Sequence, residues 1–293
     1  MLASGAGKHY CASTKPGTIM NRLSLARRTQ IINCLVEGNS IRSTERMTET
    51  HRDTVCRLLV EVGEGCAKIM NERMRDLSCR RVQVDEIWSY VGKKQMHLKP
   101  GEDRSRLGDM WTFVALDPDT KLVPAYRVGK RTRPHAVAFM ADLSGRLANK
   151  VQLSSDALNT YVDAVEQAFG AGVDYGQAVK FYDAELVGPG RYAPPRVVSQ
   201  TKHVVAGNPD QAHISTSLVE RQNLTMRMSM RRFTRLTNAF SKKVENLQAA
   251  VALHFAYYNF VRMHKTIRMT PAMAAGVEPS LWSIEELVDR ASN

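Results

Sequence analysis

The sequence predicts a mixed α/β protein with an all-helical N-terminal region, and three observations indicate this fold class. Residues 23–64 place apolar side chains at helical spacing, interrupted by two short turns. Residues 81–128 contain three runs rich in strand-forming residues. Helical and strand-like segments then alternate before two long helices close the chain. Three consecutive strands followed by helix, strand and helix are typical of a mixed α/β domain.

The N-terminal region divides into three expected helices. The turn Gly38-Asn39 ends the first, Ser40 is suited to cap a short second helix, and Gly63 ends the third. Three short helices with a tight second turn favour a helix-turn-helix, whose last helix enters the major groove of DNA. Arg52 and Arg57 lie on that last helix and are the expected contacts to DNA. A small helical bundle with solvated arginines is the alternative.

The elements expected beyond this region follow from residue type and spacing. In order they are strands at 82–91, 110–116 and 122–128, a helix at 134–147, a strand at 150–153, a helix at 157–169, two or three strands between 179 and 205, and helices from about 217 and from about 244 to 261. The expected regions are a disordered leader at 1–20, the helix-turn-helix at 21–64, a helical linker at 65–80, the α/β domain at 81–277 and a C-terminal tail at 278–293.

The composition favours a polyanionic partner. The 293 residues carry a net charge of +12, and the isoelectric point is near 9.6. Nucleic acid is the first candidate for such a partner, ahead of a membrane surface. No apolar run approaches the ~20 residues needed to cross a bilayer. The five cysteines lie far apart without a CxxC pair, so we expect reduced thiols.

The stretch 215–243 concentrates positive charge around one acid. Between Glu220 and the next carboxylate, Glu245, lie seven cations, namely Arg221, Arg227, Arg231, Arg232, Arg235, Lys242 and Lys243. In a helix, Glu220 and Arg227 share a face because seven positions make roughly two turns. A carboxylate surrounded by cations suggests a metal ligand beside a polyanion, and the DNA contacts expected here are Arg227, Arg231, Arg232 and Arg235. A solvated basic helix is the alternative.

Two further acids occupy unusual positions. Asp85 lies in the middle of an expected strand, where a charge is costly to bury without a partner. Asp156 directly follows a short apolar strand, the position at which open α/β sheets place functional groups. With Glu220, these acids can meet at one edge of a sheet and supply oxygen ligands to Mg²⁺. Two such ions would support hydrolysis or transfer of a phosphodiester.

The segments around these acids resemble the DDE motif of bacterial insertion-sequence transposases, and most closely the insertion sequence 1 family. The matching segments are VDEIWSYV, LSSDALNTY and STSLVERQNLTMRMSMRRFTRLTNAFSKK, and HFAYYNFVRMHKTIRMTPAMAAGV resembles the segment that follows the glutamate in that group. The resemblance implies an RNase H-like catalytic core behind a helix-turn-helix.

Carried over to this sequence, the resemblance implies that Asp85, Asp156 and Glu220 hold two Mg²⁺ ions, with Mn²⁺ as a substitute. Arg227 matches a basic residue that contacts DNA near the scissile phosphate. The partners implied are double-stranded DNA at element ends and target, and a second copy in a homodimer or larger synaptic assembly. The implied location is the bacterial cytoplasm, on the nucleoid.

One departure from the family pattern concerns cysteines. Members often carry a cysteine zinc motif ahead of the helix-turn-helix, whereas here only Cys11 precedes it. That leaves recognition of the terminal repeat open. A catalytically inactive, transposase-derived helix-turn-helix protein and an RNase H-like nuclease are the alternative functions.

The acids also have rivals. Glu86 competes with Asp85, and strand alternation predicts that only one of the two points at the site. Asp163 and Asp183 compete with Asp156.

Overall fold

The computed structural model describes residues 22–183, 196–234 and 237–293. Within this part of the chain, the strands form a six-stranded sheet in the order β3-β2-β1-β4-β5-β6. β1, β2 and β3 pair antiparallel, β4 joins β1 and β5 joins β4 in parallel, and β6 returns antiparallel to β5. The strands are β1 (Arg81–Val91), β2 (Gly108–Leu116), β3 (Tyr126–Gly129), β4 (Val151–Ser155), β5 (Val173–Asp183) and β6 (Arg196–Ala206).

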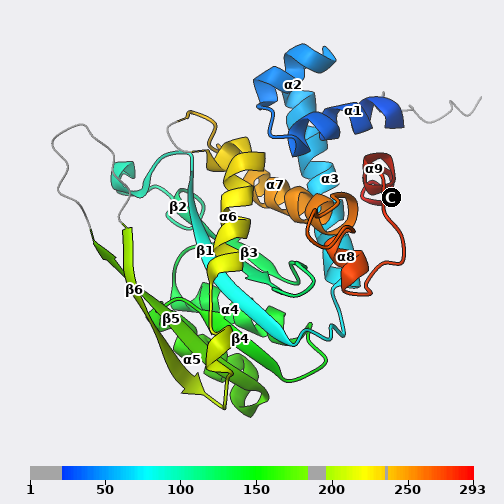
Figure 1. The fold of residues 1–293 in the computed structure, drawn as a ribbon. Helices are drawn as coiled ribbons and strands as arrows, with labels where there is room; N and C mark the ends of the chain where they lie inside the picture. Colours follow the sequence, from blue (N-terminus) through cyan, green and yellow to red (C-terminus); the bar gives the residue numbers. More distant parts are fainter. Residues whose placement is uncertain (1–21, 184–195, 235–236) are drawn as a thin grey trace, which may run out of the picture.

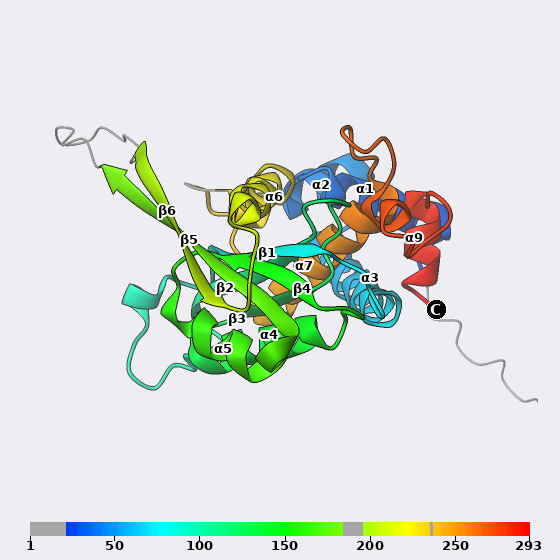
Figure 2. The ribbon, with the colours of Figure 1, turned by 60° about the horizontal axis from the view of Figure 1, so that its bottom comes forward.

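Helices cover both faces of the sheet, which confirms the mixed α/β fold class. Figures 1 and 2 show α4 and α5 on one face and α6 on the other. The helices are α1 (Leu25–Val36), α2 (Ile41–Thr48), α3 (Arg52–Arg73), α4 (Arg133–Ser144), α5 (Asn159–Phe169), α6 (Ser217–Ser229), α7 (Val244–Ala256), α8 (Pro271–Ala274) and α9 (Ile284–Arg290). None of these helices is both long enough and apolar enough to span a membrane.

The three expected N-terminal helices are present as α1, α2 and α3. Ser40 caps α2 as predicted, because its hydroxyl accepts a hydrogen bond from the backbone N–H of Ser43 at 3.0 Å. The third helix, however, does not end at Gly63 but continues to Arg73. The prediction of its end was wrong because Gly63 allows a close approach to α7. A Cβ on Gly63 would lie 2.6 Å from Cα of Ala249 on that helix.

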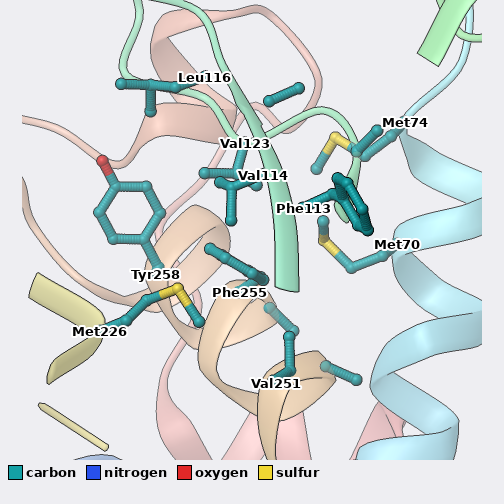
Figure 3. Packing of buried hydrophobic residues seen from close by; sticks show 14 of the residues in the cluster. Met70, Met74, Phe113, Val114, Leu116, Val123, Met226, Val251, Phe255 and Tyr258 are labelled. Atoms are coloured by element: carbon teal, nitrogen blue, oxygen red, sulfur yellow. The ribbon is translucent and has the colours of Figure 1, made fainter. Parts of the chain in front are cut away.

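Helix α3 contributes to the same hydrophobic core as the sheet. In Figure 3, Met70 of α3 and Met74, which caps the end of α3, lie close to Phe113 of β2, and Val251 and Phe255 of α7 complete that part of the core. The apolar cluster extends from α1 to the C-terminal α9. The division into regions 21–64, 65–80 and 81–277 stays a prediction, and α3 continues into the expected linker as far as Arg73.

One expected strand is shorter than predicted, and the basic helix ends before its later arginines. The third strand starts at Tyr126 instead of residue 122, because the Asn259 side chain binds both the N–H and the carbonyl of Val123 in place of a neighbouring strand. The basic helix α6 ends at Ser229, so Arg231 and Arg232 lie on a following 3-10 turn. Arg235 and the leader 1–20 lie outside the described residues.

Replacing Gly63 with alanine should lower the free energy of unfolding. Helix propensity favours alanine by about 1 kcal/mol, yet the added methyl group would overlap the Ala249 backbone, and overpacking of this kind costs about 1–3 kcal/mol. Denaturant unfolding measures the change. Gly172→Ala is the control, because a Cβ there would meet nothing within 4 Å. Equal stabilities of the two variants would contradict the close packing of α3 on α7.

Candidate metal centre

Three carboxylates converge where β1 and β4 separate. Asp85 and Glu86 are consecutive residues of β1, and Asp156 follows the last residue of β4. One oxygen from each carboxylate lies within 4.8 Å of the others. The parallel pairing of β1 with β4 stops at Gln83 and Ser154, two residues before Asp85. Beyond that point β1 has no strand neighbour on this side in the described chain, so side chains from both of its faces can reach the space next to Asp156.

The structure corrects the prediction that only one of Asp85 and Glu86 points at the site. The two side chains do lean to opposite faces, as alternation requires. Asp85 Oδ2 accepts a hydrogen bond of 2.8 Å from Asn223 on α6. Glu86 Oε2 accepts one of 2.8 Å from the Tyr161 hydroxyl on α5. Both carboxylates still reach Asp156, because the space left by the end of β4 is open to both faces.

Burial and mutual repulsion shift the titration of all three acids. Burial raises the pKa of Asp85 to about 7, and the charges of Glu86, Asp156 and Glu220 add to the rise. Burial also raises the pKa of Glu86 and of Asp156, and repulsion between these two adds to the shift at Glu86. Each acid therefore loses its proton less readily than it would in water.

Two cations partly offset this negative charge. Arg131 forms an ion pair with Glu86 Oε1 at 2.6 Å, and its guanidinium also stacks over the Trp111 ring, 4.7 Å from the centroid. Lys180 of β5 pairs with Glu220. The charges of Arg131 and Lys180 both lower the pKa of Asp156 against the effect of burial.

Glu220 lies beside the cluster without joining it. It occupies the first turn of α6, where its Oε1 accepts hydrogen bonds from Lys180 and, at 2.6 Å, from the Thr216 hydroxyl. Its charge nevertheless raises the pKa of both Asp85 and Asp156. The structure therefore brings together two of the three predicted acids, adds Glu86, and holds Glu220 nearby on a lysine.

The donor set suits a hard divalent cation such as Mg²⁺ or Mn²⁺, which prefers carboxylate oxygens. A cation would also relieve the repulsion that raises these pKa values. Asn223 provides a further observation, because its Oδ1 is buried without a hydrogen-bond partner in the described part of the chain. Its Nδ2 binds Asp85, so an unused oxygen acceptor lies next to the cluster.

The rival acids lie elsewhere. Asp163 on α5 is half exposed and pairs with Arg133 at 3.1 Å. Asp183 is the last residue of β5 and is exposed. Neither belongs to the group of convergent carboxylates found among residues 22–183, 196–234 and 237–293.

The predicted DNA-binding arginines fall into two groups. Arg52 and Arg57 at the start of α3, and Arg231 after α6, are exposed. Arg227 is half-buried on α6, and Arg232 is turned inward. Arg232 donates a hydrogen bond of 2.9 Å to Ser241 Oγ, and burial lowers the pKa of its guanidinium.

Sequence reasoning missed the residues that surround the acids. Strand alternation predicted that Glu86 would point away from the site if Asp85 pointed toward it. Arg131, Tyr161 and Lys180 lie in separate segments, and no local pattern connects them to Asp85. Of these residues, Tyr161 is the one whose position in the sequence indicates a place near the site, since it lies near the start of the helix that follows Asp156.

Comparison with known proteins gives distant structural matches. No family description and no curated protein matches the sequence. Among solved structures, the Mos1 transposase paired-end complex with left transposon end is 14% identical with a TM-score of 0.22, and a pre-cleavage Mos1 transpososome is 13% identical with a TM-score of 0.20. Each match covers 55% of this chain and 60% of the other. The Mos1 strand transfer complex is 11% identical with a TM-score of 0.23 over 83% of this chain and 79% of the other. TM-scores this low do not establish a shared fold.

Replacing Asp85 with asparagine should stabilise the cation-free protein at pH 8. The pKa of Asp85 in the folded state, about 7, lies above its ordinary 3.8. The folded protein therefore retains a proton that the unfolded chain loses, and stability falls as pH rises from about 4 to about 7. Asp85→Asn removes that loss, a gain of up to about 4 kcal/mol at pH 8. Thermal melts with a chelator measure it.

Added Mg²⁺ should reverse the order of the two proteins. The cation raises the melting temperature of the wild type and has little effect on Asp85→Asn, because the variant lacks a ligand. Asp163→Asn is the matched control, since this exposed acid lies outside the cluster and its loss should change neither result. A wild type whose melting temperature ignores Mg²⁺ and Mn²⁺ would argue against a metal site.

Proposed function

We propose that this protein is a DNA transposase of the DDE type with an RNase H-like core, which cuts and joins DNA with Mg²⁺ or Mn²⁺. The observation that carries the proposal is the convergence of Asp85, Glu86 and Asp156 at the sheet edge, with Glu220 alongside. The strongly basic composition supports a nucleic-acid substrate. The resemblance to insertion sequence 1 transposases points to the same chemistry and to a bacterial mobile element.

The protein's own groups define the reaction site. Asp85 and Asp156 are the principal metal ligands, Glu86 is a further ligand, and Glu220 joins them once Lys180 releases it. Cations bound there would activate the attacking hydroxyl and stabilise charge on the phosphodiester. Asn223 keeps Asp85 oriented through its 2.8 Å hydrogen bond. Lys180, once free of Glu220, would be available to a phosphate oxygen of the substrate.

The N-terminal helices lie next to the C-terminal end of α6, the helix that carries Glu220 in its first turn. The turn between α1 and α2 packs on the end of α6, because a Cβ on Gly38 would lie 3.2 Å from the Ser229 carbonyl oxygen. Arg232, just beyond α6, lies close enough to α3 for its charge to lower the pKa of Cys56 against the effect of burial. The exposed Arg57 and Arg231 therefore belong to neighbouring elements, and both are available to phosphates.

The rival functions make different predictions about the same site. A transposase-derived DNA-binding protein without activity would bind DNA through α3 but would not nick it in Mg²⁺. A nuclease acting on RNA:DNA hybrids has no use for a helix inserted in the major groove, because the major groove of an A-form duplex is too narrow.

Asp156→Asn should abolish metal-dependent cleavage of DNA while leaving DNA affinity nearly unchanged. The amide removes one ligand charge at the cluster without changing the side-chain volume. Nicking of supercoiled plasmid in Mg²⁺ or Mn²⁺ measures activity, and electrophoretic mobility shifts measure binding. The control is Asp163→Asn, which should cleave as the wild type does. Cleavage retained by Asp156→Asn would disprove the proposed chemistry.

Arg57→Ala should weaken DNA binding and reduce its dependence on salt. Removing one interaction with a phosphate lowers the slope of log K against log[salt] by about 1. Fluorescence anisotropy at several salt concentrations provides the slope. Lys68→Ala is the matched control, because Lys68 is an exposed cation on the same helix about three turns away. Equal slopes for both variants would remove α3 from the DNA-binding surface.

A further inference from the structure

Strand β6 is an open sheet edge. It is the outermost strand, eleven residues long, and in the described part of the chain its strand partner is β5. Figures 1 and 2 show the β5–β6 pair extending away from the rest of the molecule. The register with β5 shifts near Val198 and Val205, and the stretch between these residues pairs without a break. A long edge strand exposes a row of backbone N–H and C=O groups, and stable proteins normally shorten, charge, bulge or cover such edges. β6 has an irregularity near each end, and residues 199–204 between them pair regularly with β5.

The side chains of β6 are unusually apolar for an exposed edge. Val197 is 52% exposed, Val198 62%, Val204 48% and Val205 37%. The single Lys or Arg between them is Lys202, and its ammonium donates a hydrogen bond of 2.6 Å to the Gln211 carbonyl of its own chain. The strand therefore carries little charge in a protein of net charge +12.

The sequence of β6 is nearly symmetrical about Thr201. Residues 197 and 205 are both valine, as are residues 198 and 204. If β6 lies antiparallel to an identical strand with Thr201 opposite Thr201, each valine faces a valine of the other copy. Lys202 then faces Gln200 of the other copy, so the two lysines are not directly opposed.

We propose that β6 pairs antiparallel with β6 of a second copy, about a two-fold axis at Thr201. The partner we infer is a second copy of β6, because in this register the valines on each side of Thr201 lie opposite the valines of the other copy. A shift by one residue in either direction would place a valine opposite a polar residue, His203 or Ser199. The pairing is isologous, so it closes on a dimer instead of propagating into a fibre. The central sheet then continues through both copies.

The β6 pairing would also set the distance between the acidic sites of the two copies, a consequence that rests on the proposed function. The pairing itself does not depend on that function. The two-fold axis of an antiparallel strand pair is perpendicular to the sheet, so the two β6 strands present the same face to one side, and the twist of the sheet turns the outer strands progressively away from it. The two β1 strands are seven strand spacings apart, about 33 Å in a flat sheet. That separation is close to one turn of B-DNA, about 34–36 Å. The dimer would then carry two acidic sites in one continuous sheet.

A charge-swap experiment tests the register. The wild type, measured by light scattering without DNA, should be dimeric. Val198→Asp alone and Val204→Lys alone should each weaken the dimer by roughly tenfold or more, because each places a charge against a valine. The double variant should recover most of the affinity, since the introduced aspartate of one copy would face the introduced lysine of the other. Leu281→Asp, at a residue 48% exposed and remote from β6 in the sequence, should have no effect.

Cysteine cross-linking tests the two-fold axis. Thr201→Cys places two thiols at a directly opposed pair, whose Cα atoms are about 4.5–5.5 Å apart and within disulfide range. Ser199→Cys on the same strand is the matched control, because its two copies would lie about 13 Å apart along the strands. Mild oxidation should therefore link Thr201→Cys dimers and not Ser199→Cys dimers.

A monomeric wild type, failure of the double variant to recover, or equal cross-linking at residues 199 and 201 would each overturn the proposal. Circular dichroism confirms that each variant is folded. Neither test uses DNA or metal, so a dimer that fails to cleave DNA would count against the proposed function and not against the β6 pairing.

Discussion

The parallel pairing of β1 with β4 stops at Gln83 and Ser154, and the acidic site depends on that stop. If β4 ran further beside β1, its backbone would fill the space in which Asp85, Glu86 and Asp156 meet. The ends of strands in α/β sheets provide such spaces, because a strand that turns away leaves its neighbour with a free edge. Here the free edge lets two consecutive residues of one strand serve the same site from opposite faces.

Buried carboxylates repel one another, and the surrounding structure limits the cost of bringing them together. Arg131 neutralises Glu86 from the loop before α4, and Lys180 occupies Glu220 from β5. Asn223 and Tyr161 supply neutral hydrogen bonds from the two helical layers. The pKa of Asp85 still rises to about 7, so these contacts do not remove the repulsion. A divalent cation would supply the missing counter-charge.

The closely packed part of the molecule lies on one side of this site and the exposed edge on the other. α3 and α7 approach closely through Gly63, and their side chains join the core beneath β2. This packing connects the predicted DNA-binding helices to the sheet. At the opposite end, β6 carries exposed valines on both sides of Thr201. The β6 pairing would give that edge the cover that the described part of the chain does not supply.

The sequence by itself determined the mixed α/β class, most helix and strand positions and the candidates Asp85, Asp156 and Glu220, because alternation, helical spacing and turn residues act over short stretches of chain. It also determined the cap at Ser40. Only the tertiary structure decided which acids meet. Strand alternation correctly placed Asp85 and Glu86 on opposite faces, but the end of β4, a property of another segment, lets both reach Asp156. Gly63 shows the same limit, because glycine suits a helix end as well as a close helix contact, and only the position of Ala249 distinguishes the two. Lys180 and Arg131 could not be assigned for the same reason: their role comes from charges that are close in space and distant in sequence.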